Sequence, residues 1–337
     1  MYCRARDGAV FRWLMGLFVA LAILAIQGWA IAQPYPAKPI RVIVPTATGG
    51  PTDILIRGLS HWFGERNGQA FVIENRTGAN TIVAAEACAK ATPDGYTICV
   101  FPRSTIVLNP VLYRGRKLPY DPEKSFEPIT NLAVGQQVLV LHPSIPANSF
   151  NAMIEWSRQN PNRINYASAG IGSNVHVYME RMKRQTGASL MHIPYKAASE
   201  APQAFERGDV HLMYLIIGNP GVMDQIRSGR SRPLLTSGYS RHPQLPDVPT
   251  FAEAGVGDFD PRNWFGMFAP AGTPKPVIAK LSAELNAILR LPAFKEKVLV
   301  AMSFEALGGT PEEFAAFLVE DRKRGAELAR ESGVTLE

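Results

Sequence analysis

Residues 40–53 read IRVIVPTATGGPTD, and this stretch decides the fold. The β-branched run at 40–44 ends at Pro45, which predicts a short strand. Gly49 and Gly50 then lead into apolar residues at helical spacing from Asp53 to Phe63, which predicts a helix. The same order recurs at once, with strands expected at 70–74 and 96–101 and a helix at 81–91. This alternation predicts an α/β unit with a largely parallel sheet.

A second series of strands and helices begins near Asn131, and Ser149 has the position and chemistry of a helix N-cap. The Pro-rich stretch 243–249 predicts a crossover, and 265–268 a strand that returns to the first unit. We therefore expect two mixed, largely parallel sheets in two lobes, 33–131 with 249–337 and 132–248, joined by a hinge of two strands. The other expected strands are 138–141, 165–168, 191–193 and 210–217, and the other helices are 149–158, 174–186, 202–207, 276–291 and 311–332.

The N-terminus has the pattern of an export signal. Arg4, Arg6 and Arg12 precede an apolar run at 13–26, and Ala30-Ile31-Ala32 follows it. A charged start, an apolar middle and small residues before a cleavage point define a secretory signal peptide. A membrane anchor is the alternative, but it needs roughly 20 apolar residues and this run is shorter. We predict a signal peptide at 1–32 and a periplasmic protein.

Length and charge limit the remaining chain. Removing 32 of 337 residues leaves 305, which suits two domains. The signal carries three Arg and one Asp of the +6 chain, so +4 remains. This excess mildly favours anionic ligands, and a solvated basic surface explains it equally well. The basic residues lack the interleaved aromatics of a nucleic-acid groove, so nucleic acid is not a predicted partner. A monomer is expected.

Cys88 and Cys99 remain after the signal is removed. An even pair in an oxidising compartment permits a disulfide. Two buried thiols are the alternative, because small apolar thiols are common in protein cores.

The first candidate site is the loop between the strand at 40–44 and its helix. Glycines let backbone amides approach a ligand closely, and the start of the following helix favours negative charge. Threonine hydroxyls add donors, and Asp53 is a candidate cap for the helix. An ordinary strand-to-helix turn is the alternative. The candidate ligand-binding residues here are Thr46, Thr48, Gly49, Gly50, Thr52 and Asp53.

The second candidate site is the strand-to-helix loop at 166–176. Its G-x-G lacks the third glycine of a dinucleotide fingerprint, because Val175 stands there. Serine hydroxyls and the free amides of a helix start can hold a carboxylate instead. The candidates are Ser168, Gly170, Gly172, Ser173, Asn174 and His176.

A third loop follows the strand at 96–101. Ser104 and Thr105 are candidate ligand-binding hydroxyls, whereas Arg103 is interpreted as a residue of a surface loop. Trp264 and Phe265 form either an apolar wall of the site or packing of the hinge.

Enzymatic motifs are absent from the sequence. Ser168 is not in G-x-S-x-G, and neither H-E-x-x-H nor C-x-x-C occurs. We predict neither a cofactor nor a metal, and no enzyme. An enzyme acting on an organic acid remains the alternative, with His176 or Asp53 as its general base. The histidines lack ligand spacing and are interpreted as surface or packed residues. They are His61, His142, His176, His192, His211 and His242.

Eight segments together resemble the Bug family, the extracytoplasmic solute receptors of tripartite tricarboxylate transporters. The resemblance implies a type II periplasmic-binding-protein fold, or Venus flytrap, that closes on a small carboxylate held by backbone amides and bridging waters. It also implies a membrane transporter as partner, or a sensor kinase. The segments are Tyr35–Arg41, Glu74–Ala79, Pro93–Thr97, Leu118–Pro122, Asn165–Gly170, His192–Lys196, Leu245–Thr250 and Trp264–Pro274.

Three departures from the family pattern concern the ligand. Thr46 and Thr48 replace the Phe and second Pro of the family's first loop and make it more polar. Leu215 stands where many members place an Asp or a small residue, which argues against an amino-acid ligand. Asn80-Thr81 replaces a usual glycine pair, which leaves the conformation of that turn open.

Overall fold

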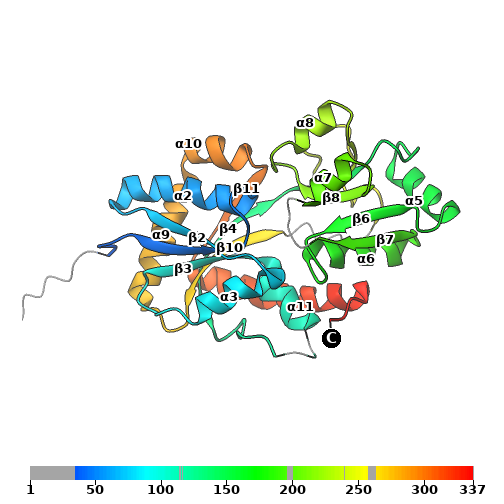
Figure 1. Cartoon of the computed structure of the whole chain (residues 1–337). Coiled ribbons are helices and arrows are strands. Elements are labelled where there is room, and N and C mark those ends of the chain that lie inside the picture. The colour runs from blue at the N-terminus through cyan, green and yellow to red at the C-terminus, as the bar shows by residue number, and fades with distance from the viewer. Residues whose placement is uncertain are drawn as a thin grey trace, which may run out of the picture. The chain divides into compact units, whose positions relative to one another are not determined.

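A computed structural model describes residues 35–113, 115, 117–195, 200–238, 240–256 and 263–336. The predicted signal peptide lies outside these residues. The chain divides into two compact units, Met1–Ala37 and Lys38–Glu337, and the helices and strands below belong to the second (Figure 1). Within the described ranges, every helix is too short or too polar to cross a membrane.

The first sheet has the strand order β11-β4-β10-β3-β1-β2. β1 pairs in parallel with both β2 and β3, whereas β10 and β11 pair antiparallel with their neighbours. The strands are β1 (Ile40–Val44), β2 (Phe71–Asn75), β3 (Thr97–Pro102), β4 (Phe126–Gly135), β10 (Trp264–Pro270) and β11 (Phe304–Gly308). Its helices are α2 (Pro51–Asn67), α3 (Ile82–Ala89), α4 (Asn109–Leu112), α9 (Lys275–Arg290), α10 (Pro292–Phe294) and α11 (Pro311–Ser332), with short helical turns η1 (Ala79–Thr81), η2 (Ser104–Leu108) and η3 (Lys295–Val300).

The second sheet has the order β7-β6-β8-β5-β9. β6 pairs in parallel with β7 and β8, and β5 is antiparallel to β8 and β9. The strands are β5 (Gln137–Leu141), β6 (Ile164–Ser168), β7 (Leu190–Pro194), β8 (Leu212–Ile216) and β9 (Arg232–Thr236). The helices are α5 (Phe150–Gln159), α6 (Asn174–Thr186), α7 (Glu200–Glu206) and α8 (Val222–Arg227).

Both sheets are mixed, as predicted, but the antiparallel share is larger than the alternation of strands and helices indicated. The reason lies in the strands that connect the sheets. β4 runs to Gly135 in the first sheet and β5 begins at Gln137 in the second, while β10 returns and pairs antiparallel with β3 and β4. The "largely parallel" description therefore holds only for β1-β2-β3 and β6-β7-β8.

Local sequence signals explain several helix boundaries. α2 begins at Pro51 with Gly50 as N-cap, so Asp53 lies inside the first turn and the predicted cap is wrong. A proline at the first helical position fits this start because it has no N–H to satisfy. The side chain of Ser149 accepts from the Ala152 amide, which confirms that cap. Thr310 and Glu313 form a capping box at the start of α11.

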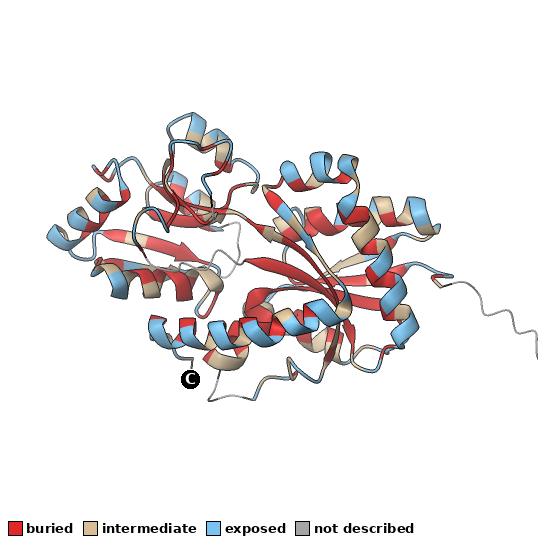
Figure 2. Cartoon of the chain, turned by 180° about the vertical axis from the view of Figure 1, so that it is seen from behind, coloured by how far each residue is buried: buried red, intermediate tan, exposed pale blue. Residues whose placement is uncertain are grey.

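Buried residues concentrate on the strands of both sheets, while the outer helix faces are exposed (Figure 2). Cys88 of α3 and Cys99 of β3 form a disulfide whose Cα atoms lie 6.3 Å apart. The structure thus decides between the two alternatives for the cysteines, and this bond fastens α3 to the sheet.

Candidate ligand-binding site

The candidate loops start where parallel strands end. β1 and β2 are parallel and in register through Val44 and Asn75, and β3 continues on the other side of β1. The loops after these strands therefore emerge at one edge of the first sheet. The loop after Ser168, the last residue of β6, emerges at the corresponding edge of the second sheet.

The first glycine turn, residues 45–50, is held by Asp53. The Gly49 amide donates to Asp53 Oδ2 at 2.9 Å, and Asn75 Nδ2 donates to Asp53 Oδ1 at 2.9 Å and to the Thr46 carbonyl at 2.8 Å. Arg57 Nε donates to the same carboxylate at 2.8 Å. Gly49 has φ +80°, a left-handed conformation that favours glycine. Asp53 thus fixes the turn.

The charge of Asp53 is balanced at its own position. Burial acts to raise the pKa of this carboxyl, but hydrogen bonds from Arg57, Gly49 and Asn75 together outweigh it and hold the pKa below its usual value. Asp53 is therefore ionised at neutral pH with its oxygens already engaged. Its negative charge is balanced by the guanidinium of Arg57.

The threonines of the first turn differ in their hydrogen bonding. Thr48 is exposed and its hydroxyl donates to Asn75 Oδ1 at 3.1 Å. Thr46 Oγ1 is buried and has no partner among the described residues. Thr52 is buried in the first turn of α2. Thr46 is thus the threonine with an oxygen available for a ligand or water.

The second glycine turn, residues 168–173, is held by His176. The Gly172 amide donates to His176 Nδ1 at 3.0 Å, and the Ser173 hydroxyl accepts from the His176 amide at 3.4 Å as the N-cap of α6. Gly172 has φ +80° and Gly170 has φ +111°. Ser168 Oγ lies 3.0 Å from the Gly170 carbonyl and accepts from the Gly170 amide at 3.2 Å.

Two histidines next to this turn are packed residues, one of the two roles expected for the histidines. His176 and His192 stack with ring centroids 4.0 Å apart and planes at 12°, and Tyr166 stacks on the other side of His192. His192 Nε2 lies 2.6 Å from Ser168 Oγ. Burial lowers the pKa of His176, and burial together with neighbouring His176 lowers the pKa of His192 to about 4. Both rings are neutral at pH 7.

Asn80 links the second turn to the loops of the first sheet. Its Nδ2 donates to the Gly172 carbonyl at 3.0 Å and to Asn109 Oδ1 at 2.7 Å, and Asn109 Nδ2 donates back to the Asn80 carbonyl at 2.9 Å. Because Asn80 follows β2, this contact brings the second glycine turn to the edge of the first sheet at which the first turn emerges. The second turn therefore lies against a loop at the carboxyl edge of the first sheet.

The backbone around Asn80 is strained. Ala79, Asn80 and Thr81 have φ of 45°, 49° and 73°, which glycine would adopt without cost. Residues 79–81 thus keep a backbone conformation that favours glycine, although none of them is glycine. Thr105 supports it, since its hydroxyl lies 2.6 Å from that of Thr81. Both Thr105 and Ser104 are buried in η2, where Thr105 serves the turn at Asn80.

Asn174 is a further candidate for ligand contact. Its Nδ2 donates to Asn263 Oδ1 at 3.0 Å. Its Oδ1 is buried and without a partner in the described part of the chain. Ile171, between the two glycines, exposes 53% of its surface and is the apolar side chain of the second turn.

Arg103 is buried, so its interpretation as a surface residue is wrong. Its guanidinium makes two 2.9 Å hydrogen bonds to Asp321 and donates to the Tyr178 hydroxyl at 2.7 Å. Trp264 Nε1 donates to Asp321 at 2.8 Å. The partner carboxylate comes from α11, near the end of the chain, and neutralises the buried guanidinium charge. This network ties α6, α11 and the first sheet together, and Trp264 belongs to it rather than to a ligand wall.

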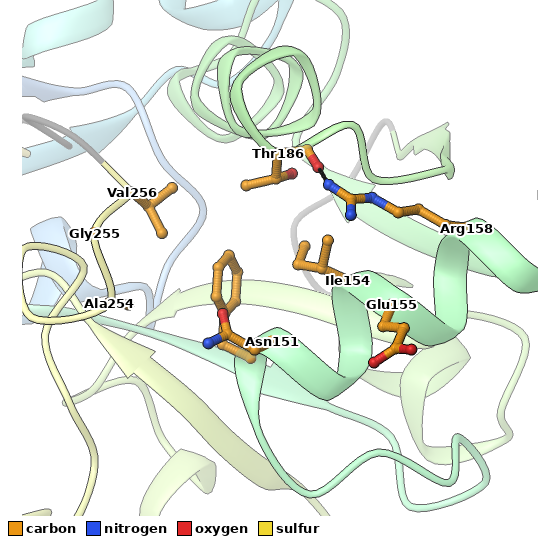
Figure 3. A pocket seen from close by; sticks show the side chains of 9 residues that line it. Asn151, Ile154, Glu155, Arg158, Thr186, Ala254, Gly255 and Val256 are labelled. Carbon is orange, nitrogen blue, oxygen red and sulfur yellow. Dashed lines mark hydrogen bonds between the residues drawn. The ribbon is translucent and has the colours of Figure 1, made fainter.

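A separate hollow of about 440 Å³ lies beside α5 (Figure 3). Phe150 and Ile154 of α5 line it, with Val256 opposite. Arg158 is engaged at the Thr186 carbonyl, as the dashed line shows. None of the residues of the glycine turns lines this hollow.

Leu215 is half-buried on β8 and packs against the core of the second sheet.

Sequence reasoning identified Asp53 and His176, which hold the turns, but missed the further residues that support these two turns. These are Asn75, Asn80 and His192, and each stands in or next to a segment that resembles the family. The position of these segments near the candidate loops was the signal that could have identified the three residues. Asp321 gave no local signal. Among the residues that the structure describes, no three His, Cys, Asp or Glu side chains gather in a way that could hold a metal ion.

Comparison with known proteins gives consistent matches over nearly the whole chain. Residues 55–334 match the model of the tripartite tricarboxylate transporter family receptor. Protein BugT of Bordetella pertussis is 32% identical over 96% of this chain and 97% of its own.

Solved structures are similar over comparable lengths. The periplasmic binding protein BugD is 33% identical with a TM-score of 0.81, covering 90% of this chain and 100% of its own. An R. palustris protein solved with adipate is 30% identical with a TM-score of 0.83, covering 89% and 99%. MatC from Rhodopseudomonas palustris, solved with malate, is 30% identical with a TM-score of 0.78, covering 88% and 100%.

Proposed function

The chain belongs to the tripartite tricarboxylate transporter family of receptors, and we propose that it captures a small dicarboxylate in the periplasm between its two glycine turns and presents it to the membrane subunits of such a transporter. The hydrogen bond from Asn80 to the Gly172 carbonyl carries this proposal, because it sets the second turn against the loop that follows β2, at the sheet edge where the first turn begins. The adipate and malate bound by two similar structures support the ligand class.

The chemistry of the turns suits an organic anion. α2 and α6 begin directly after the two turns, and the first amides of a helix have no intrahelical acceptor. Amide-to-carboxylate hydrogen bonds are charge-assisted and contribute about 1.5–3 kcal/mol each. A handful of them suffices for micromolar binding, which corresponds to roughly 8 kcal/mol. Thr46 Oγ1 and Asn174 Oδ1 supply further unpartnered polar atoms.

The side chains around the turns narrow the ligand further. Ile171 offers an exposed apolar contact within the second turn, which suits the short carbon chain of a dicarboxylate. Leu215 in place of an acidic residue offers no partner for an ammonium group. We therefore expect dicarboxylates to bind more tightly than amino acids of the same length.

Calorimetric titration of the exported protein against malate, adipate, acetate and aspartate tests the function. We expect micromolar binding of malate or adipate, and weaker binding of acetate, which has one carboxylate, and of aspartate, which adds an ammonium group. Gly172→Val should abolish binding, because a Cβ there would lie 2.5 Å from Leu336 in a left-handed backbone conformation. Arg158→Ala, in the separate hollow, is the matched control and should bind normally. Absence of heat with every acid would refute the proposal.

A further inference from the structure

The second glycine turn depends on the protonation of one imidazole. A backbone amide can only donate, so the 3.0 Å contact between the Gly172 amide and His176 Nδ1 requires that this nitrogen accept. The neutral ring must then carry its proton on Nε2. His176 is buried, and stacking on His192 fixes the plane of its ring. The ring therefore has little freedom to turn its other nitrogen toward Gly172.

The charged groups around His176 on its own helix and the neighbouring strands are already paired. Glu180 of α6 accepts from Lys183 at 2.8 and 2.9 Å and from the Tyr166 hydroxyl of β6 at 2.6 Å. From β7, His192 faces the ring directly. Glu180 favours a charged His176, whereas Lys183 opposes it.

The helix packed against α6 adds two further ion pairs. On α11, Glu331 pairs with Arg181 at 2.7 Å, and Asp321 pairs with Arg103, which donates to Tyr178. These carboxylates therefore have cations of their own, and the lowered pKa of His176 follows mainly from its burial.

Resting on the proposed carboxylate binding, we infer that His176 is a positioning residue, whose unprotonated Nδ1 holds Gly172 in place and whose protonation weakens ligand capture. A protonated Nδ1 would direct its N–H against the Gly172 N–H, and the turn would have to move. Leu112, Leu336 and Asn80 surround Gly172, so a small adjustment is blocked and the ordered turn is lost.

A charged imidazole would also attract an anion, which opposes this effect. That attraction acts through a solvated site and is weak at high dielectric. Leaving the buried Gly172 N–H without an acceptor costs more free energy than this attraction returns. We therefore expect affinity for malate or adipate to fall about tenfold between pH 7.5 and pH 5. The lowered pKa of His176 places the change below the ordinary histidine range.

Two substitutions separate positioning from simple packing. His176→Asn places an amide oxygen where Nδ1 stands, keeps the acceptor for Gly172 and cannot be protonated. His176→Leu fills the space without an acceptor. At pH 7.5 we expect the Asn variant to bind within about threefold of the wild type and the Leu variant about tenfold more weakly. His142→Asn is the control, since burial also lowers the pKa of His142 in the same lobe, away from the turn.

The pH profile is measured as the ratio of wild-type to variant affinity, in which titration of the ligand cancels. The ratio for His176→Asn should fall about tenfold on acidification, and that for His142→Asn should stay constant. A constant ratio for His176→Asn, or wild-type affinity that rises relative to it at pH 5, overturns the inference.

A measurement without ligand separates this inference from the proposed function. Ring-nitrogen NMR of histidine-labelled protein, assigned with His176→Asn, should show the Nε2–H form of His176 at pH 7.5. The Nδ1–H form would overturn the inference. If the wild type bound neither acid, the proposed function would fail, while the ring spectrum would still decide the role of His176.

Discussion

The two glycine turns have the same construction and different chemistry. In each, a glycine with φ +80° donates its amide to a side chain four residues further on, in the helix that follows. In the first turn the acceptor is the carboxylate of Asp53, and in the second it is the imidazole of His176. The difference teaches that the strand–glycine–helix pattern specifies a backbone shape, while the acceptor sets how that shape responds to pH.

The two acceptors diverge because their neighbours differ. Arg57 and Asn75 keep Asp53 ionised, so the first turn keeps its brace over the whole range near neutrality. His176 has a stacked imidazole beside it and must stay neutral to accept. We expect acid to weaken the second turn before the first.

Removing the support beneath α6 should have the largest effect. Arg103→Met leaves the buried carboxylate of Asp321 without its cation, and we expect the free energy of unfolding to fall by about 3–5 kcal/mol. Urea denaturation measures this. The double variant Arg103→Met with Asp321→Leu should recover most of the loss, because no buried charge remains unpaired. A single variant as stable as the wild type would show that α6 does not depend on this pair.

Removing the acceptor of the first turn should have the next largest effect. Asp53→Ala leaves the Gly49 amide and the Asn75 amide without their acceptor, which should cost about 1–3 kcal/mol of stability. The loss of ligand affinity should be the same at pH 7.5 and pH 5, unlike that of the His176 variants. Arg57→Ala is the control and should cost less, since this side chain is half exposed. A pH-dependent loss in Asp53→Ala would erase the contrast between the turns.

The stability of the second turn should depend on pH through His192. Its pKa is about 4 in the native state and near 6.5 in the unfolded chain, so between these values only the unfolded chain binds the proton. The stability that the neutral His192 ring contributes is complete above pH 6.5 and is lost as the pH falls toward 4. Discounted for solvent screening, the loss from pH 7 to pH 5 should be about 1 kcal/mol.

His192→Gln should remove this part of the pH dependence, because the amide reaches Ser168 without titrating. Denaturation curves at pH 7 and pH 5 for the wild type and the variant measure it. An unchanged slope in His192→Gln would place the pH sensitivity elsewhere.

The sequence predicted the elements that local signals determine. The helices at 174–186 and 311–332 begin and end as expected, because Ser173 and Thr310 cap them and Gly187 and Gly333 end them. The glycine turns were also found. Short strands such as β9 and β11 were missed, since pairing with distant strands rather than their own composition makes them strands.

The residues that hold the site were harder to predict because their partners are distant along the chain. Arg103 is buried only because Asp321 comes from the last helix. His176 and His192 stack because α6 and β7 flank β6, which spacing along the sequence cannot express. The conformation at Asn80 was open for a similar reason, since contacts with Asn109 and Gly172 compensate for its positive φ.

The smallest expected effect concerns the contact between Asn80 and the second turn. Asn80→Gly relieves the left-handed backbone, which should return about 1–3 kcal/mol, but it loses the hydrogen bonds to the Gly172 carbonyl and Asn109, each worth about 0.5–1.5 kcal/mol. Stability should therefore change by about 1 kcal/mol or less, while ligand affinity falls severalfold because the second turn is no longer held against the first sheet. Asn80→Asp, which keeps the strain and sets a carboxylate against the Gly172 carbonyl, should bind more weakly still. Calorimetry at pH 7.5 ranks the three proteins, and equal affinity in all of them would mean that the two turns act independently and that their difference in pH response has no bearing on capture.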